Sequence, residues 1–124
     1  MLNDNKKREA PEIVLRCQQF AVRIVKVAGA LPKNPAGFAI ANQLVRAGTA
    51  IGANLEEAQE SPTKKDFCHK LSICIKESRE TLFWLDVIQE SRLINSKRLH
   101  SIVDKNEQIL KVLKSILKSA KKHR

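Results

Sequence analysis

Glycine and proline are rare in this chain, and where they stand limits the fold more than any other feature. The 124 residues hold four of each, and all eight precede residue 63. Since these residues are the strongest breakers of regular structure, residues 63–124 contain no strong stop. Apolar residues recur there at steps of three and four, which predicts two long amphipathic helices. The absence of tyrosine and the aromatic content of 4% also argue against a β-rich domain.

Stop and start signals divide the first half of the chain into helices as well. Gly29 and the prolines that follow it end a first helix, and Asn34 before Pro35 is a typical start for a second. We interpret Ser61 followed by Pro62 as the same kind of start for a third helix. The predicted helices cover residues 12–30, 35–59, 62–91 and 96–120, between a flexible basic leader (residues 1–11) and a basic tail (residues 121–124).

Short connections between long amphipathic helices favour antiparallel neighbours. We therefore predict an all-α fold, an antiparallel up-down-up-down four-helix bundle. The inward faces follow from the apolar spacing. They are expected to include Cys17, Phe20 and Ile24; Phe38, Leu44, Gly48, Ile51 and Leu55; Leu71, Cys74, Ser78, Leu85 and Ile88; and Leu99, Ile102, Asn106, Ile109 and Leu113.

Length and composition indicate one globular domain. At 14.0 kDa the chain is long enough for a single compact core. Its three cysteines lack a CxxC pairing, which is typical of reduced thiols in a cytosolic protein. The polar N-terminus does not resemble a signal peptide, and no apolar run approaches the ~20 residues that a membrane span needs. We therefore expect a soluble, cytoplasmic protein that has no membrane partner.

Two glycines interrupt the second predicted helix. Gly48 and Gly52 are four residues apart, so they lie on one face of the helix. Each costs roughly 1 kcal/mol relative to alanine in a helix interior, and close packing must offset that loss. We interpret the pair as a helix-contact seam. It serves either tight packing within the chain or contact between subunits.

Glutamates spaced three apart occur on the second and third predicted helices. Bundles that bind two metal ions combine inward glutamates with Glu-x-x-His motifs, and no histidine here follows a glutamate by three residues. We therefore predict neither a metal site nor a cofactor. A half-buried polar structural layer explains the acids better, because buried carboxylates without partners are costly. The layer comprises Arg46, Asn54, Glu57, Glu77 and Glu80.

Two stretches of the chain resemble a known family. They are RAGTAIGANLEEAQES at residues 46–61 and DFCHKLSICIKESRETLFWL at residues 66–85. The family is the four-helix-bundle proteins encoded in intervening sequences of bacterial 23S ribosomal RNA genes. Its pattern joins an arginine, a small-residue helix and Asn-x-x-Glu to a later Lys-Glu-x-x-Glu-Thr-x-x-Trp-Leu. In this chain the pattern falls on Arg46, Asn54, Glu57, Lys76, Glu77, Glu80, Thr81, Trp84 and Leu85.

The resemblance covers about residues 12–120 and implies a left-handed bundle, often assembled as a ring-like homopentamer. Relatives of the family include the accessory proteins of diversity-generating retroelements, which form basic pentameric barrels that bind nucleic acid and a reverse transcriptase. No catalytic residues follow from the resemblance. It implies an architecture and an association with nucleic acid rather than an activity.

Most of the excess positive charge lies in the last quarter of the chain. The formal net charge is +10, and residues 93–124 contribute nine basic and two acidic residues, a net +7. Lysines recur there at steps of three and four, away from the apolar side of the helix. Such a pattern is typical of a solvated face or of a surface that contacts phosphates. The candidate nucleic-acid-binding residues are Lys111, Lys114, Lys118, Lys121, Lys122 and Arg124.

These observations predict a non-enzymatic, oligomeric protein that associates non-specifically with nucleic acid, RNA rather than DNA. The expected assembly is a homopentamer. The alternative is a structural or adaptor module that binds a protein partner, with lysines that serve only solubility. An enzyme or metal protein centred on the glutamates is a third hypothesis, against which stands the lack of a Walker loop, a dinucleotide fingerprint, a nucleophile elbow or an HExxH motif.

Overall fold

Four α-helices make up the protein, as a computed structural model that describes residues 11–123 shows. They are α2 (Glu12–Gly29), α3 (Pro35–Ala58), α4 (Lys64–Glu90) and α5 (Ser96–Lys122). No strand occurs among residues 11–123, so the predicted all-α class is confirmed. Every bound lies within two residues of its prediction, and α5 continues into the predicted basic tail. Residues 1–10 of the predicted leader and Arg124 lie outside the described residues.

Side-chain caps explain why α3 and α5 begin where they do. The side-chain oxygen of Asn34 accepts a hydrogen bond from the Gly37 N–H at 2.8 Å, and Pro35 follows as the first helical residue. At α5, the side-chain oxygen of Asn95 accepts from the Lys97 N–H at 2.9 Å. Each cap satisfies a backbone donor that has no partner within the helix.

The start of α4 differs from its prediction. Thr63, rather than Ser61, is the N-cap, so Pro62 precedes the helix. The Thr63 hydroxyl accepts from the Asp66 N–H at 3.1 Å and donates to the Asp66 carboxylate at 2.8 Å. This reciprocal pair resembles a capping box and also places an acid in the first helical turn, where the helix dipole favours it. It is therefore a stronger start than a serine followed by proline.

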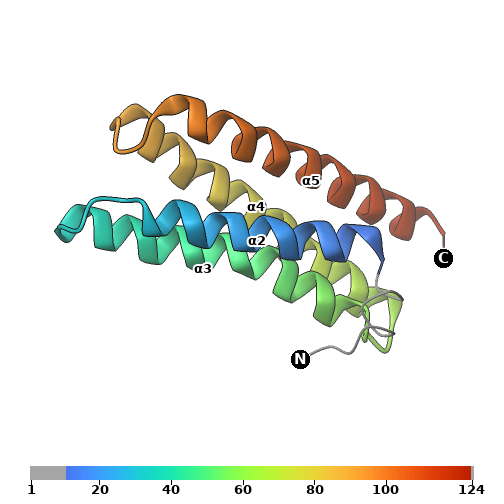
Figure 1. Ribbon diagram of the computed structural model, residues 1–124. Helices are drawn as coiled ribbons and strands as arrows, with labels where there is room; N and C mark the ends of the chain where they lie inside the picture. Colours follow the sequence, from blue (N-terminus) through green and yellow to red (C-terminus); the bar gives the residue numbers. More distant parts are fainter. Residues whose placement is uncertain (1–10, 124) are drawn as a thin grey trace.

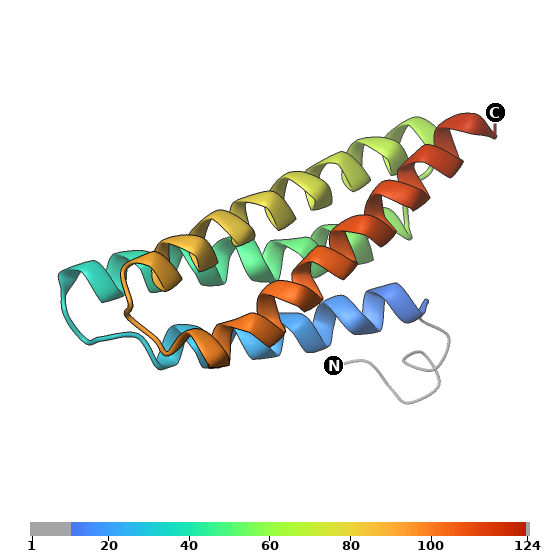
Figure 2. The same cartoon turned by 90° about the horizontal axis from the view of Figure 1, so that it is seen from above.

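The helices run in alternating directions and stand side by side in Figures 1 and 2. Gly48 of α3 lies against Ile24 of α2, and Gly52 lies against Cys17, so these two helices are antiparallel. In the polar contacts between α3 and α4, and between α2 and α5, residues later in one helix meet residues earlier in the other, so these pairs are antiparallel as well. The interface of α3 with α4 is the most extensive, and that of α2 with α5 is the least. In Figure 2, α5 crosses the bundle obliquely, from α2 toward the start of α4.

The core contains nearly all of the residues predicted to face inward. Its largest fully buried side chains come from all four helices. They are Phe20, Ile24, Leu44, Ile51, Leu55, Leu71, Leu85, Ile88, Leu99, Ile102, Ile109 and Leu113. Burial of these aliphatic groups is the main source of stability, at roughly 1.5–3 kcal/mol for each large side chain.

Phe38 is the exception, because its side chain is 56% exposed rather than inward. The neighbouring Gly37 is buried, and a Cβ placed there would overlap the carbonyl oxygen of Pro32. The first turn of α3 thus turns its glycine toward the preceding loop. Since successive helical residues point about 100° apart, Phe38 is directed outward.

A polar pair crosses the core between α4 and α5. Ser78 and Asn106 are both fully buried. The Ser78 hydroxyl donates to the side-chain oxygen of Asn106 at 2.6 Å, and the Asn106 amide donates to the Ser78 carbonyl at 3.2 Å. Within residues 11–123 no buried side-chain nitrogen or oxygen lacks a hydrogen-bond partner. The pair therefore carries no penalty for an unsatisfied polar group.

Some large apolar side chains remain more than half exposed. Besides Phe38 they are Val22 and Val25 on α2 and Phe83 on α4. Phe83 lies edge-on to Trp84, with ring centroids 5.0 Å apart. No helix in the described part of the chain combines the length and apolar character needed to cross a membrane.

Candidate nucleic-acid interface

Five lysines on the outer side of α5 form a continuous basic surface, which we call the lysine face. They are Lys111, Lys114, Lys118, Lys121 and Lys122, and all five are exposed. The opposite side of the same helix is buried in the core through residues such as Ile109 and Leu113. The helical repeat of 3.6 residues accounts for this division, since lysines three and four apart return to one side.

The lysines of the face take no part in the ion pairs of the described residues. Within residues 11–123 the ion pairs are Arg46 with Glu77, Arg46 with Glu80 and Lys70 with Glu57, and none involves the face. Two of its lysines occupy the last turn of α5, where a cation also stabilises the helix dipole. Arg124, which the sequence places beside these lysines, lies outside the described residues.

The predicted polar layer is only partly assembled, around Arg46. Its guanidinium contacts Glu77 at 3.4 Å and also pairs with Glu80, both on α4. The indole N–H of Trp84 donates to the same Glu80 carboxylate at 3.2 Å. The side chain of Glu77 is only 12% exposed, whereas that of Arg46 is 48% exposed. A planar guanidinium suits this bridge because it can bind two carboxylates at once.

Asn54 and Glu57 lie apart from this network. The Asn54 side chain donates to the Ala50 carbonyl of its own helix at 2.8 Å. The carboxylate of Glu57, with its side chain 62% exposed, meets Lys70 of α4 at 3.5 Å. Both residues follow Arg46 by two or more turns of α3, which is too far along the helix for a shared contact.

The helix-contact seam lies inside the subunit. A Cβ added at Gly48 would stand 2.7 Å from a methyl group of Ile24, and one at Gly52 would stand 3.2 Å from the Cβ of Cys17. The missing side chains therefore allow α2 and α3 to approach closely. Of the two interpretations left open by the sequence, the geometry supports tight packing within the chain.

Comparison with known proteins identifies the family. The protein-family model described as "23S rRNA-intervening sequence protein" matches residues 9–115, which is most of the chain. The chain belongs to this family. Among solved structures it is similar to a Bacteroides thetaiotaomicron VPI-5482 protein, described as a protein with unknown function from the S23 ribosomal protein family. The two are 36% identical with a TM-score of 0.81, and the match covers 86% of this chain and 98% of the other. No curated protein matches the chain.

The predicted resemblance to the 23S rRNA-intervening sequence proteins is thus confirmed. Arg46, Glu77, Glu80 and Trp84, which carry part of that resemblance, meet in one network between α3 and α4. Neither the family description nor that of the solved relative names an enzymatic activity. For this 23S rRNA-intervening sequence protein, the residues that identify the family contribute to the fold.

The cysteines of this family member are free thiols. Cys17 and Cys74 are fully buried, and Cys68 is partly buried. Burial raises the pKa of the Cys17 thiol to about 11 and that of the Cys74 thiol to about 12. Thiols that stay protonated are poor nucleophiles. Among the described residues, no three His, Cys, Asp or Glu side chains are grouped so that they could hold a metal ion.

The sequence analysis missed one feature, a pocket between α2 and the start of α5. Arg23, Lys26 and Arg98 are among the residues that line it. The spacing of Arg23 and Lys26 places them close together on α2, which the sequence could have indicated. Arg98 is distant in sequence, and only the packing of α5 against α2 places it beside them.

Proposed function

We propose that this 23S rRNA-intervening sequence protein is a non-enzymatic, oligomeric protein that associates with RNA through the lysine face of α5. The observation that carries the proposal is that all five lysines are exposed on one side of one helix, outside every ion pair formed within residues 11–123. A row of uncompensated cations attracts a phosphate backbone and releases its counterions on binding.

Recognition would rest on the shape and charge of the polymer rather than on its sequence. Lysine provides point charges, whereas base readout generally relies on planar groups that bind in a bidentate manner. The helix that bears the face also has no phenylalanine, tyrosine or tryptophan on which bases could stack. We expect RNA rather than DNA as the polymer, and comparison of binding to both polymers tests this.

Oligomerisation would bring several copies of this weakly binding surface together. We expect a homopentamer, in which five lysine faces act on one polymer with an avidity that a single copy lacks. The half-exposed side chains of Val22, Val25, Phe38 and Phe83 offer apolar surface for contacts between subunits. Sedimentation of the purified chain at micromolar concentration measures the assembly. A clean monomer would contradict this part of the proposal.

Charge reversal on the lysine face tests the RNA contact. Lys111→Glu, Lys114→Glu and Lys118→Glu are combined, and binding to a fluorescent RNA and to the matching DNA is measured by anisotropy over a range of salt concentrations. If the three lysines contact phosphates, the salt slope of log K falls by about 3, because each phosphate contact contributes about one unit.

The matched control reverses three exposed lysines elsewhere, Lys33, Lys76 and Lys97, with the same change in net charge. We expect it to keep most of the salt slope. Equal losses in both variants would show a diffuse charge effect with no particular face. If the wild type binds neither polymer at low salt, the RNA proposal fails, and an adaptor that binds a protein partner becomes the better explanation.

A further inference from the structure

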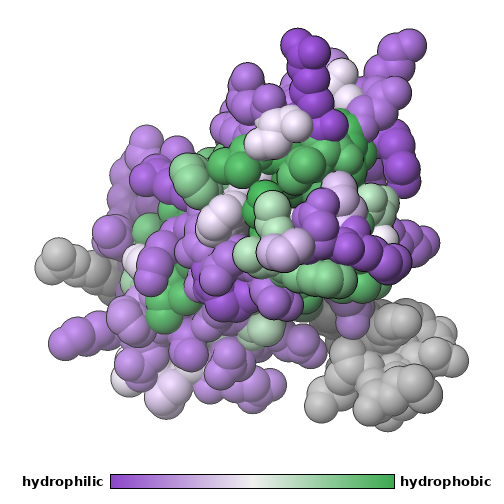
Figure 3. Space-filling model, turned by 90° about the vertical axis from the view of Figure 1, so that its left-hand side faces the viewer, coloured by the Kyte–Doolittle hydropathy of each residue, from purple (hydrophilic) through white to green (hydrophobic). Residues whose placement is uncertain are grey.

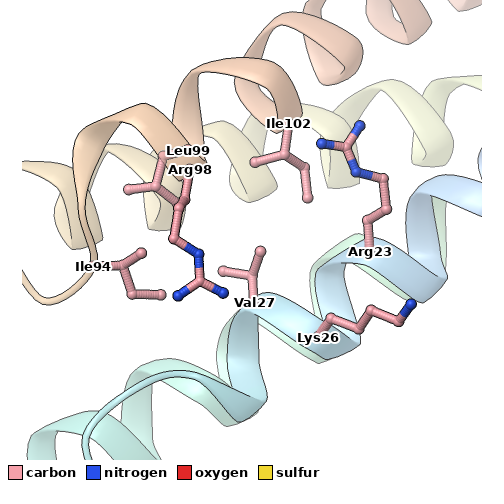
Figure 4. A pocket seen from close by; sticks show the side chains of 7 residues that line it. All are labelled: Arg23, Lys26, Val27, Ile94, Arg98, Leu99 and Ile102. Carbon is pink, nitrogen blue, oxygen red and sulfur yellow. The ribbon is translucent and has the colours of Figure 1, made fainter.

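The pocket between α2 and α5 combines positive charge with an apolar floor. Its volume is about 140 Å³. The basic lining residues are Arg23 and Lys26 from α2 and Arg98 from α5, and the apolar ones are Val27, Ile94, Leu99 and Ile102. Figure 4 shows Arg98 pointing from α5 toward α2, with its guanidinium between Ile94 and Val27, and Arg23 pointing from α2 toward α5, with its guanidinium beside Ile102.

No carboxylate lines this pocket. Arg23 donates to the hydroxyl of Ser101 at 2.9 Å, which holds the side chain in place without neutralising its charge. Within residues 11–123, none of the three basic residues forms an ion pair. Glu90 lines a neighbouring hollow that shares Ile94 with this pocket. Three cations therefore surround the opening with no acid among them.

The floor of the pocket is aliphatic and firmly held. Leu99 and Ile102 are almost completely buried, and Ile94 is 8% exposed. This end of the bundle, which faces the viewer in Figure 3, has apolar surface among hydrophilic side chains. A cavity of about 150 Å³ lined by aliphatic and aromatic side chains is large enough to hold benzene. The pocket therefore has room for an apolar group of a few carbon atoms.

We infer that this pocket binds a small organic carboxylate with a short apolar body, such as an aryl or branched-chain acid. The planar fork of Arg98 fits a carboxylate in a bidentate manner, Arg23 and Lys26 add positive charge, and the aliphatic floor takes the body of the molecule. An inorganic anion would make no contact with the aliphatic floor, and a neutral molecule would form no charge-assisted hydrogen bond with the basic side chains. The inference does not rest on RNA binding, because the lysine face lies elsewhere on α5.

Methyl NMR of the full chain tests the site with benzoate as the probe. The expected result is a saturable shift of the methyl signals of Val27, Ile94, Leu99 and Ile102. Benzyl alcohol has a similar shape without the charge, and inorganic phosphate has charge without the apolar body. Both are expected to bind at least about tenfold more weakly, since a charge-assisted hydrogen bond or a buried ring each contributes that much. Equal binding of either molecule, or no saturable shift with benzoate, would overturn the inference.

Two variants of adjacent residues separate the pocket from general charge. Arg98→Glu reverses a lining cation, and Lys97→Glu makes the same charge change one residue away, outside the lining. Both side chains are exposed, so neither change disturbs the core. Arg98→Glu should weaken benzoate binding at least about tenfold, the value of one lost charge-assisted hydrogen bond, while Lys97→Glu should leave it nearly unchanged. Equal effects would overturn the inference.

The lysine-face variant provides a further control. Substitution of Lys111, Lys114 and Lys118 by Glu is expected to leave benzoate binding intact, even where RNA binding is lost. A spectrum of Arg98→Glu with the dispersed methyl signals of the wild type confirms folding, and Arg23→Gln supplies a second, milder variant. Failure of the RNA proposal therefore leaves this inference standing, and the reverse also holds.

Discussion

The two sides of this bundle are held together by different means. Where α3 packs on α2 and α4, the helices approach closely over glycines, and Arg46 joins two carboxylates across the interface. Where α2 meets α5, contact is least extensive, and arginines bond neutral partners. We call these the tight side and the open side. The difference teaches that Arg46 on the tight side is committed to ion pairs across the interface, whereas Arg23 and Arg98 on the open side form no ion pair within residues 11–123.

Gly48→Leu should have the largest effect, because it attacks the tight side directly. The new side chain would enter space filled by the fully buried Ile24. Overpacking of this kind costs about 3 kcal/mol or more when the backbone must move. The free energy of unfolding from urea titration measures the loss.

Gly29→Leu is the matched control for this change. A Cβ at Gly29 meets nothing within 4 Å, so this variant should be as stable as the wild type within about 0.5 kcal/mol. If Gly48→Leu is equally well tolerated, then α2 and α3 are not closely packed, and the distinction between the two sides fails.

Alkaline pH should weaken the tight side next, through its buried thiols. The pKa values of Cys17 and Cys74 in the folded chain, about 11 and about 12, lie above the ordinary value of 9.0. Well below pH 9 both thiols are protonated in the folded and unfolded chains, and their contribution is fully present. As the pH rises from 9, the unfolded chain loses protons that the folded chain keeps. The free energy of unfolding then falls by about 1 kcal/mol for each thiol between pH 9 and pH 10.

Measurement of urea unfolding at pH 8, 9 and 10 tests this expectation. A variant with Cys17→Ala and Cys74→Ala retains every lysine, so lysine titration affects both proteins alike. The wild type should lose more stability than the variant as the pH rises. Parallel curves for the two proteins would show that the thiols are not the cause.

Removal of one arginine from each side compares the two directly, with the smallest expected effects. Arg46→Ala leaves Glu77, whose side chain is only 12% exposed, without its cation, and we expect a loss of about 1–2 kcal/mol. Arg16→Ala removes an exposed bond to Gln108 on the open side and should cost less than about 0.5 kcal/mol. Thermal unfolding of the two variants under one buffer condition gives the comparison. A larger loss for Arg16→Ala would reverse our assignment of the two sides.

Periodicity and capping residues were enough to predict the helices, but local geometry decided the details. Asn34 and Pro35 begin α3 as predicted, because a cap works through its own side chain and the next few residues. At α4 the competition between Ser61 and Thr63 depended on a reciprocal bond to Asp66. Such a bond becomes evident only when the backbone of the turn is known.

The end of α4 shows a second limit of prediction. Arg92 has a φ of 55°, a conformation usually left to glycine. The Arg92 N–H bonds the Gln89 carbonyl and the Leu93 N–H bonds the Ile88 carbonyl, which together form a Schellman motif. Nothing in the residue type at position 92 indicates this turn. The loop into α5 therefore could not be derived from composition.

Of the candidate site residues, those that depend on a single helix were predictable. The exposure of the lysine face follows from spacing along α5 alone. Contacts between two helices were not predictable, because the spacing within one helix does not show which turn of its neighbour lies beside it. The sequence therefore placed Glu57 in one layer with Arg46, whereas Arg46 pairs with Glu77 and Glu80, and Glu57 pairs with Lys70. It also did not indicate that Arg23 and Arg98 line one pocket.

The buried pair of Ser78 and Asn106 has a consequence for the whole of α5. If α5 slid by one helical turn, about 5.4 Å, Ser78 and Asn106 would each lose the hydrogen bonds that join them. The pair therefore fixes the lengthwise position of α5 against α4. Arg98 lies about two turns from Asn106 on the same helix, so its position along α4 is set by a hydrogen bond that Arg98 does not make.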